Sequence, residues 1–309
     1  MDKVSAFAPA SVANVGPGFD VLGFALEGIG DIVRAKRTNE PGVRISKIIG
    51  DNGLLPLETM KNTASIAALG VLQRLEIKGA GIEIELEKGL PLNSGLGSSG
   101  ASAVAGAFAA LRLFAPENEK DFALPACVKA EAAVAGFHAD NVAASLFGGI
   151  VIVKSYEPLE VLKLPAPAGL FAAVVSPDYE VSTKDARHAL PENVPLKSLV
   201  RNTGNVASLV SGVFRNDIGL IGRSVQDCIV EPVRGKFIPG FDAVKKAALD
   251  AGAFGCSISG SGPSVFAFAD SLQTGKSIAK EMEGAFSANG LASKSHVSKV
   301  NRVGAKVIS

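Results

Sequence analysis

The sequence is poor in the residues that build disulfide frameworks and zinc sites. Its 309 residues include three cysteines, three histidines and no tryptophan. The cysteines form no CxxC pair and are odd in number, which predicts reduced thiols in a cytoplasmic protein. The histidines stand far apart, with no HxxxH spacing and no Cys/His grouping, so the sequence shows no metal cage of this type.

The sequence also lacks an excess of charge of one sign and long apolar runs. It has 31 basic and 30 acidic residues, and no Lys/Arg cluster is dense enough to indicate nucleic acid or an anionic membrane. No apolar run reaches the length of a membrane span, and Asp2 and Pro9 make the beginning of the chain unlike a secretory signal. We therefore expect small-molecule partners, with neither nucleic acid nor membrane among them.

The most informative segment that is present is PLNSGLGSSGA, residues 91–101. Gly95, Gly97 and Gly100 let the backbone curl with its N–H groups pointing inward, while Ser98 and Ser99 offer hydroxyls to oxygen or a metal. The following ASAVAGAFAALRLF is helical in composition, so the loop also delivers the positive end of a helix. The segment predicts a site for an anion such as the phosphates of a nucleotide.

Two common phosphate loops fit this segment poorly. A Walker A loop ends in Gly-Lys-Ser/Thr, and no lysine occurs between Lys88 and Lys120. GLGSSG matches the GxGxxG dinucleotide pattern, but residues 89–94 separate it from the strand-like residues 81–88, whereas that fold wants the first glycine directly after its strand. A plain glycine-rich turn stays open as an alternative.

The chain is long enough for two domains, and a proline-rich stretch after Tyr156 predicts a boundary there, with domains over residues 1–155 and 156–309. Alternating or β-branched residues predict strands over residues 4–10, 31–37, 43–49, 81–88, 150–154, 170–176, 255–259, 264–269 and 296–300. Apolar spacing and Ala/Leu content predict helices over residues 62–75, 102–114, 124–135, 241–251 and 277–288, with two more in 196–226.

Two further glycine-rich segments stand on either side of the loop in the sequence. NVGPGFDVLG occupies residues 14–23, and SISGSGPS occupies residues 257–264. Each alone is typical of an ordinary turn. Together with residues 91–101, in this order and at this spacing, they resemble the GHMP kinase superfamily, named for galacto-, homoserine, mevalonate and phosphomevalonate kinases, over nearly the whole chain.

Within this superfamily the chain is most similar to the homoserine kinases, through ANVGPGFDVLGFAL, PLNSGLGSSGASA, HADNVAASLFGG and SISGSGPS. The resemblance implies an α+β fold with an N-terminal domain like ribosomal protein S5 domain 2 and a ferredoxin-like C-terminal domain. It implies phosphoryl transfer from ATP, with Mg²⁺, to the hydroxyl of L-homoserine on the route to threonine. A homodimer is a further expectation, although the sequence shows no interface.

The resemblance also assigns a nucleotide and metal site. Mg²⁺ would be coordinated by Ser99 and Glu131, and Asn62 would lie near the adenine. The phosphates would be held by the glycine loop, Pro91, Leu92, Asn93, Ser94, Gly95, Leu96, Gly97, Ser98, Ser99, Gly100 and Ala101. Without the resemblance, Glu131 is typical of a solvated helix carboxylate.

For the acceptor, the resembling positions offer charges opposite to those of an amino acid. Arg187 and Arg234 suit the carboxylate, because guanidinium groups bind carboxylates bidentately, and Asp20 suits the ammonium. The remaining polar atoms would be fixed by Asn14, His138 and Asn141. A structural histidine near a turn remains an equal interpretation of His138.

The catalytic base is left open by the HADN segment, residues 138–141. Either Asp140 takes the hydroxyl proton or Asn141 stands at the chemistry, and an amide cannot act as a base. Phosphoryl transfer through a loose transition state depends mainly on alignment and charge stabilisation. The sequence therefore predicts Asn141 as a positioning residue, Asp140 as an open candidate, and Thr183 near the hydroxyl or the phosphate.

Two other functions stay open. A mevalonate- or sugar-type kinase of the same superfamily would share the glycine loop but would not need two arginines for a carboxylate. A nucleotide-binding sensor without catalysis is the second, and the intact Ser99, Glu131 and glycine loop argue against it.

Overall fold

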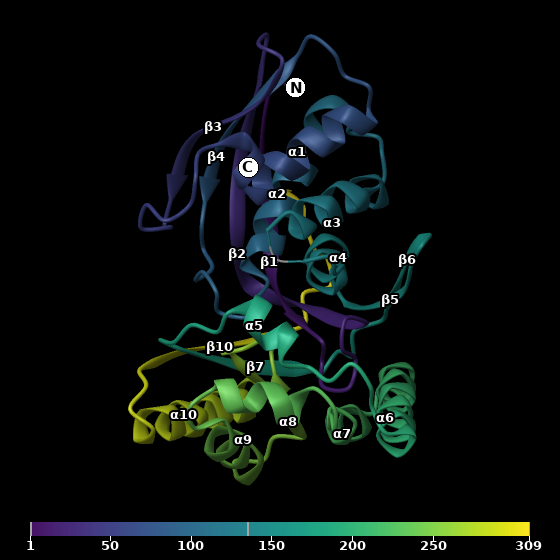
Figure 1. Cartoon of the computed structure of the whole chain (residues 1–309), viewed down its shortest axis with the longest axis vertical. Coiled ribbons are helices and arrows are strands. Elements are labelled where there is room, and N and C mark those ends of the chain that lie inside the picture. Colours follow the sequence, from purple (N-terminus) through teal and green to yellow (C-terminus); the bar gives the residue numbers. More distant parts are fainter. Residues whose placement is uncertain (1, 135, 309) are drawn as a thin grey trace.

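Two β-sheets and the helices that cover them make up the chain, for which the computed structural model describes residues 2–134 and 136–308. The larger sheet occupies the upper half of Figure 1 and the smaller sheet the lower half. Among the described residues, no helix is both long and apolar enough to cross a membrane.

The larger sheet has seven strands in the order β11-β1-β2-β4-β3, with β5 paired to β2 and β6 paired to β5. Pairing is antiparallel except between β3 and β4, which run parallel. The strands are β1 (Lys3–Ala13), β2 (Leu22–Thr38), β3 (Gly42–Ile49), β4 (Gly81–Glu87), β5 (Ile150–Tyr156), β6 (Leu159–Leu164) and β11 (Lys306–Ile308).

One face of this sheet is covered by four helices (Figure 1), and the apolar residues between them form a continuous core. The helix α2 is rich in alanine and glycine, which lets α1 come close: a Cβ added at Gly106 would lie 2.1 Å from the carbonyl oxygen of Ala64. The helices are α1 (Thr63–Arg74), α2 (Ser98–Phe114), α3 (Leu124–Ala132) and α4 (Asp140–Phe147), with short 3-10 turns at Thr59–Lys61 and Lys120–Ala123.

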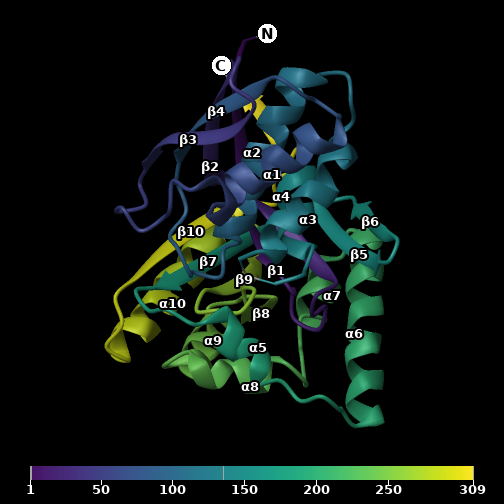
Figure 2. The same ribbon diagram turned by 45° about the horizontal axis from the view of Figure 1, so that its top comes forward.

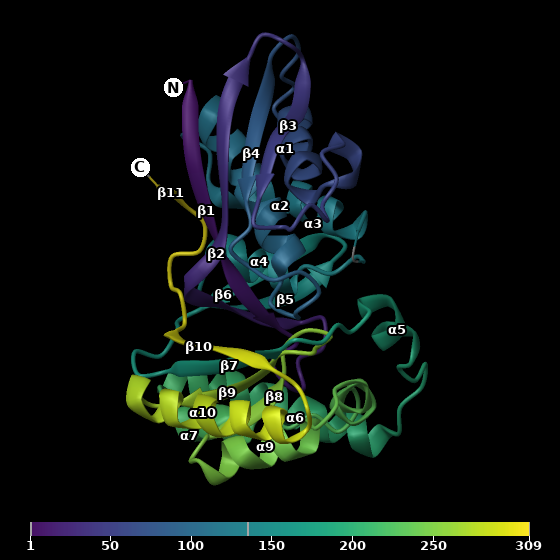
Figure 3. The ribbon, with the colours of Figure 1, turned by 90° about the vertical axis from the view of Figure 1, so that its left-hand side faces the viewer.

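The smaller sheet is fully antiparallel, in the order β10-β7-β9-β8. Its strands are β7 (Phe171–Pro177), β8 (Gly255–Ile258), β9 (Val265–Ala269) and β10 (Ser293–Lys299). Helices follow β7 and β9 in the chain, which gives the β-α-β-β-α-β succession of a ferredoxin-like domain. The α10 and α9 helices lie along one side of this sheet in Figure 3.

The helices of this half begin with α5 (Thr183–His188), which lies close to the junction of the two sheets in Figure 1. The others are α6 (Leu196–Arg215), α7 (Ile218–Arg223), α8 (Glu231–Arg234), α9 (Phe241–Asp250) and α10 (Leu272–Ala288), with a 3-10 turn at Gly235–Phe237. The two halves share an apolar core, in which the ring centroid of Phe24 on β2 lies 5.7 Å from that of Phe266 and 5.4 Å from that of Phe268 on β9.

The predicted α+β fold with N- and C-terminal domains is confirmed, and several boundaries need correction. β2 begins at Leu22 instead of residue 31, and α2 begins at Ser98 instead of residue 102. The residues expected as a proline-rich linker include β6, and α4 was not predicted. The helix predicted over residues 124–135 ends at Ala132, and residue 135 itself lies outside the described residues.

The domain limits at residues 155 and 156 stay a prediction. β6 pairs with β5 from Ile150 to Tyr156, so residues up to Leu164 remain in the seven-stranded sheet. At the other end, β11 returns to pair with β1. The chain therefore passes between the two sheets twice, after β6 and again after β10.

Candidate active site

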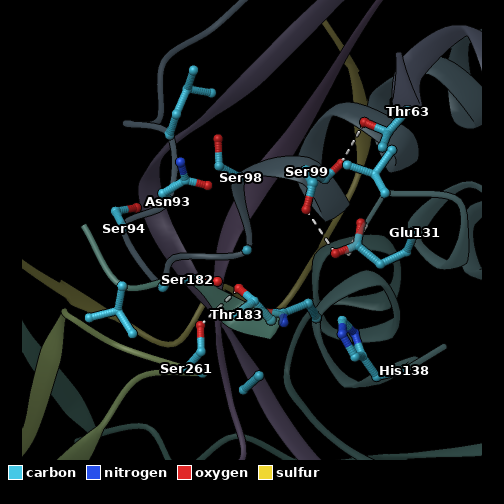
Figure 4. Close-up of a pocket in the computed structure, with 18 of the residues that line it drawn as sticks. Thr63, Asn93, Ser94, Ser98, Ser99, Glu131, His138, Ser182, Thr183 and Ser261 are labelled. Carbon is cyan, nitrogen blue, oxygen red and sulfur yellow. Dashed lines mark hydrogen bonds between the residues drawn. The ribbon is translucent and has the colours of Figure 1, made fainter. Parts of the chain in front are cut away.

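A cavity of about 890 Å³ lies where the three glycine-rich segments of the sequence meet. The 14–20 turn, the glycine loop and residues 260–261 all contribute to its wall, together with the beginning of α5. Segments more than 200 residues apart in sequence are thus brought to one place. Figure 4 shows the serine, threonine, carboxylate and histidine side chains that surround part of this space.

The glycine loop is shaped by backbone conformations that side chains would block. Gly97 precedes α2 with φ +65°, and a Cβ there would lie 2.2 Å from Ser11 Oγ and 2.7 Å from Asn141 Oδ1. The Ser259 hydroxyl donates to the carbonyl of Gly95 at 2.6 Å, and the N–H of Ser264 donates to the carbonyl of Ser94 at 3.1 Å. The loop is therefore fixed to both halves of the molecule, with the first turn of α2 at the cavity.

A hydroxyl and a carboxylate meet beside this first turn. The Ser99 Oγ donates to Glu131 Oε1 at 2.8 Å, and Thr63 Oγ1 donates to the carbonyl of Ser99 at 3.0 Å (Figure 4). Glu131 is 2% exposed, so the solvated-carboxylate interpretation is wrong. Burial raises the pKa of Glu131 above its ordinary value, and the Ser99 hydrogen bond and the charge of His138 oppose that rise.

One carboxylate and two guanidinium groups form a second cluster in the cavity wall. Arg187 Nη2 donates to both carboxylate oxygens of Asp20, at 2.8 and 2.9 Å. Arg234 donates from Nη1 to the carbonyl of Gly260 at 2.9 Å and is 3% exposed. Its pKa is lowered to about 10, first by burial and then by the charge of Arg187. This arrangement offers two cations and one anion to a small ligand.

Asn14 connects this cluster to the turn at residue 260. Its Oδ1 accepts the N–H of Asp20 at 3.0 Å, and its Nδ2 donates to the carbonyl of Gly260 at 2.7 Å. Asn14 has φ +69° and Asp20 has φ +57°, the left-handed conformation that asparagine and aspartate tolerate better than most residues. The side chain of Asn14 therefore holds the turn that presents Asp20.

Known proteins match the chain over its whole length. Residues 62–149 match the GHMP kinases N terminal domain, and residues 208–288 match GHMP kinases C terminal. A homoserine kinase of Chloroherpeton thalassium is 46% identical over 320 residues, which cover 100% of both chains, and one of Arabidopsis thaliana is 44% identical over 99% of this chain and 85% of its own. The crystal structure of homoserine kinase from Cytophaga hutchinsonii gives a TM-score of 0.96 at 52% identity, covering 100% of this chain and 98% of that one.

The chain belongs to the homoserine kinases of the GHMP kinase family. In this GHMP kinase, the donors at the beginning of α2 fit a divalent cation. Glu131 Oε2 is buried without a hydrogen-bond partner among the described residues, and it lies beside the Ser99 hydroxyl. Carboxylate and hydroxyl oxygens are ligands suited to Mg²⁺. The two residues expected to coordinate the metal are therefore adjacent, and the Oε2 atom of Glu131 is available as a ligand.

The HADN segment of this kinase begins α4 and lies against the glycine loop. The Ser11 hydroxyl donates to Asn141 Oδ1 at 2.9 Å, which fixes the amide next to Gly97. Asp140 is 2% exposed, and its Oδ1 accepts the N–H of Asn141 at 2.9 Å. Burial raises the pKa of Asp140, and the charge of His138 opposes that rise. His138, 7% exposed, also lines the cavity, so all three predicted residues come together there.

Thr183 stands across the cavity at the beginning of α5. Its Oγ1 lies 3.1 Å from Ser261 Oγ, a contact visible in Figure 4. Asn62 also lines the cavity, where its Oδ1 accepts the N–H of Ala64 at 3.1 Å and caps α1. Both predicted residues are therefore at the site, each already engaged by the protein.

Four of the predicted nucleotide residues do not line the cavity: Pro91, Leu96, Gly100 and Ala101. Leu96 and Ala101 belong to the core between the two halves, because the turn of α2 that directs Ser98, Ser99 and Ser102 to the cavity directs Ala101 away from it. The other predicted loop residues line the cavity, namely Leu92, Asn93, Ser94, Gly95, Gly97, Ser98 and Ser99.

Lys88 is one of several residues lining the cavity that the sequence did not single out, and Ser102, Glu180 and Ser261 are others. Its ammonium forms an ion pair with Asp31 and donates to Ser98 Oγ at 2.8 Å and to Ser102 Oγ at 2.9 Å. Asp31 also accepts the N–H of Gly89 at 3.0 Å. The available signal was a pair of opposite charges on two adjacent strands, with Asp31 inside β2 and Lys88 directly after β4.

Proposed function

We propose that this protein transfers the terminal phosphoryl group of ATP to the side-chain hydroxyl of L-homoserine, producing O-phospho-L-homoserine and ADP in threonine biosynthesis. The homoserine kinases that match over the whole chain support this assignment. The observation that carries it within the site is the cluster of Asp20, Arg187 and Arg234 in one cavity wall. Its charges complement those of an α-amino acid, which distinguishes this acceptor from an uncharged sugar.

The nucleotide phosphates bind at the glycine loop, where the first turn of α2 provides N–H donors and the positive end of the helix dipole. Ser99 and Glu131 would hold Mg²⁺, which offsets phosphate charge when it is bound. Lys88, buried beneath the same turn, keeps Ser98 and Ser102 in place. Asn62 would contact the base from its position at the beginning of α1.

The acceptor lies between the arginines and the glycine loop. Its carboxylate binds Arg187 and Arg234, its ammonium binds Asp20, and its hydroxyl is oriented by Asn141 and Thr183, with Asn14 and His138 fixing the remaining polar atoms. Asn141 suits this role because its amide is already fixed by Ser11 beside the loop. Alignment and charge stabilisation then carry most of the rate enhancement, and Asp140 is the candidate to receive the hydroxyl proton.

The deciding experiment is release of ADP from Mg-ATP by the purified protein, with L-homoserine, mevalonate, galactose, L-serine and L-threonine compared as acceptors. We expect release with L-homoserine, and phosphohomoserine identified by mass spectrometry. Release with another acceptor instead would retain the kinase activity and overturn the substrate. ATP binding without turnover on any acceptor would contradict catalysis itself.

We also propose a cytoplasmic homodimer. The thiols of Cys127 and Cys256 are free and buried, as expected of a reducing compartment. α6 lies at an edge of the molecule in Figures 1 and 2. Three exposed apolar side chains lie on the same face of this helix: Leu196 (74%), Val200 (65%) and Phe214 (65%). Light scattering of the wild type and of Val200→Lys/Phe214→Lys tests this, since a wild-type monomer would overturn it.

A further inference from the structure

The two arginines of the acceptor cluster share one aromatic ring. The guanidinium carbon of Arg187 lies 5.2 Å from the ring centroid of Phe19, and that of Arg234 lies 5.0 Å from the same centroid. Arg187 comes from α5 and Arg234 from the end of α8, so the ring joins two elements that are not adjacent in the chain. Cations are attracted to the face of an aromatic ring at this range.

The guanidinium groups of Arg187 and Arg234 repel each other, and Asp20 does not form hydrogen bonds with both of them. Asp20 accepts hydrogen bonds from Arg187, whereas the hydrogen bond of Arg234 goes to the carbonyl of Gly260. The charge of Arg187 contributes to lowering the pKa of Arg234. The ring of Phe19 is a neutral surface that attracts both cations without occupying their N–H donors.

Unused donors remain on both arginines. The Nε atoms of Arg187 and Arg234 are buried and have no hydrogen-bond partner among the described residues. A buried polar group without a partner is costly, so a native structure commonly reserves such a donor for a ligand or water. Both residues line the cavity.

The turn that carries Phe19 is itself held in place. Asp20, the next residue, donates its N–H to Asn14 Oδ1 at 3.0 Å, and Tyr156 donates its hydroxyl to the carbonyl of Asp20 at 3.0 Å. These two hydrogen bonds fix the backbone beside Phe19, and neither of them involves an arginine.

We propose that Phe19 is a positioning residue for the acceptor carboxylate, with its ring holding Arg187 and Arg234 together as a fork that selects carboxylate-bearing acceptors. The inference rests on the proposed function for the identity of the acceptor. It concerns specificity, because the ring acts through the arginines and the phosphate end of the cavity is formed by other residues.

The test compares L-homoserine with 3-amino-1-propanol, the same molecule without its carboxylate. Phe19→Leu removes the ring and retains an apolar side chain, Phe19→Met is a second such variant in case the first fails to fold, and Phe19→Tyr restores the ring. We expect Leu and Met to lower the ratio of kcat/KM for L-homoserine over 3-amino-1-propanol by about 10-fold, with the KM for ATP unchanged. Tyr should restore the ratio.

A matched control exists in the same chain. Arg37 lies over the ring of Phe114 at 4.3 Å, at the end of α2 and outside the residues that line the cavity. Phe114→Leu removes a cation–ring contact of the same kind and should leave the acceptor ratio unchanged. Folded Phe19 variants that lose both acceptors equally, or that keep the wild-type ratio, would overturn the proposal.

Ligand binding measured by calorimetry tests the role of Phe19 independently of the proposed kinase activity. If the wild type releases no ADP with L-homoserine, the function fails, and binding of L-homoserine against 3-amino-1-propanol without nucleotide still measures the fork. Wild-type preference for the carboxylate ligand, reduced about 10-fold by Phe19→Leu, would support the role of Phe19 in that case as well. No carboxylate preference in the wild type would overturn it.

Discussion

Lys88 and Asp31 form an ion pair that is sealed beneath the first turns of α2, with side chains 1% and 0% exposed. Within the described part of the chain, the Lys88 ammonium also donates hydrogen bonds to α2, to the carbonyl of Ser98 at 3.0 Å and to the hydroxyls of Ser98 and Ser102. Asp31 in turn accepts N–H groups from the segment that enters the glycine loop. The pair therefore sets the position of the loop at both of its ends.

Replacing Lys88 should destabilise the fold strongly. Lys88→Met leaves the Asp31 carboxylate buried without its cation, and breaking a buried pair on one side costs about 3–5 kcal/mol. Urea unfolding of the ligand-free protein measures this. Lys154→Met is the matched control, because its ion pair with Glu160 is exposed and should contribute less than about 1 kcal/mol. Equal losses in the two variants would show that the buried pair is not structural.

Sequence reasoning located the site where a motif has a strong local signature. Gly95 and Gly97 predict a loop whose backbone conformation excludes side chains at these positions, and Ser99 follows at the beginning of a helix. The element boundaries were less accurate: α4 is eight residues long, and the Asp140-Asn141 start signal before VAASLF was overlooked. β6 was hidden by the prolines around it.

Long-range pairing explains what the sequence did not reveal. Asp31 and Lys88 are 57 residues apart, and a charged residue at the end of a strand is usually solvated, so neither is conspicuous alone. Phe19 stands between glycine, proline and aspartate, where turn chemistry accounts for the segment without any aromatic role. Only the fold brings Arg187 and Arg234 to its ring.

Glu131→Gln should separate metal binding from stability. The change removes a carboxylate charge whose Oε2 has no hydrogen-bond partner among the residues that the structure describes, so the ligand-free protein should keep its Tm or gain about 2 °C. Because an amide is a weaker ligand for Mg²⁺, the Mg²⁺ concentration for half-maximal ADP release should rise about 10-fold or more. Titration of Mg²⁺ at saturating ATP measures this, and an unchanged midpoint would remove Glu131 from the metal site.

The same residue predicts a pH dependence. Burial raises the pKa of Glu131 above its ordinary value of 4.5, so the folded chain holds a proton that the unfolded chain releases. The contribution of Glu131 to stability is therefore present below pH 4.5 and lost as the pH rises through the folded pKa. Unfolding of wild type and Glu131→Gln across this range, without nucleotide or metal, should show a loss in the wild type that the variant lacks.

Asp140→Asn tests whether the reaction uses a general base. We expect kcat within about 10-fold of wild type, because the Asp140 carboxylate already accepts the N–H of Asn141 and a loose phosphoryl transition state needs little proton abstraction. A general base contributes about 10²–10⁴-fold, so a loss in that range would assign the role to Asp140. Asn141→Ala is the comparison, with an expected loss of about 100-fold in kcat because the acceptor hydroxyl is misplaced.

Replacing either cavity arginine should raise the KM for L-homoserine, and the two replacements should differ in their effect on the free energy of unfolding. Arg187→Ala and Arg234→Ala each remove charged hydrogen bonds to the acceptor carboxylate, so each should raise the KM for L-homoserine by about 10- to 100-fold and leave the KM for ATP unchanged. Arg187 has a side chain 40% exposed, and its loss should alter unfolding free energy by less than about 1 kcal/mol. Arg234 is 3% exposed and donates a hydrogen bond to the carbonyl of Gly260, so its removal should lower the free energy of unfolding by more, about 2 kcal/mol.

Arg223→Ala, which replaces an exposed arginine outside the cavity lining, is the control for general charge effects. If both cavity variants kept the wild-type KM for L-homoserine, the acceptor carboxylate would have to bind elsewhere, and a kinase for an uncharged alcohol would become the better assignment.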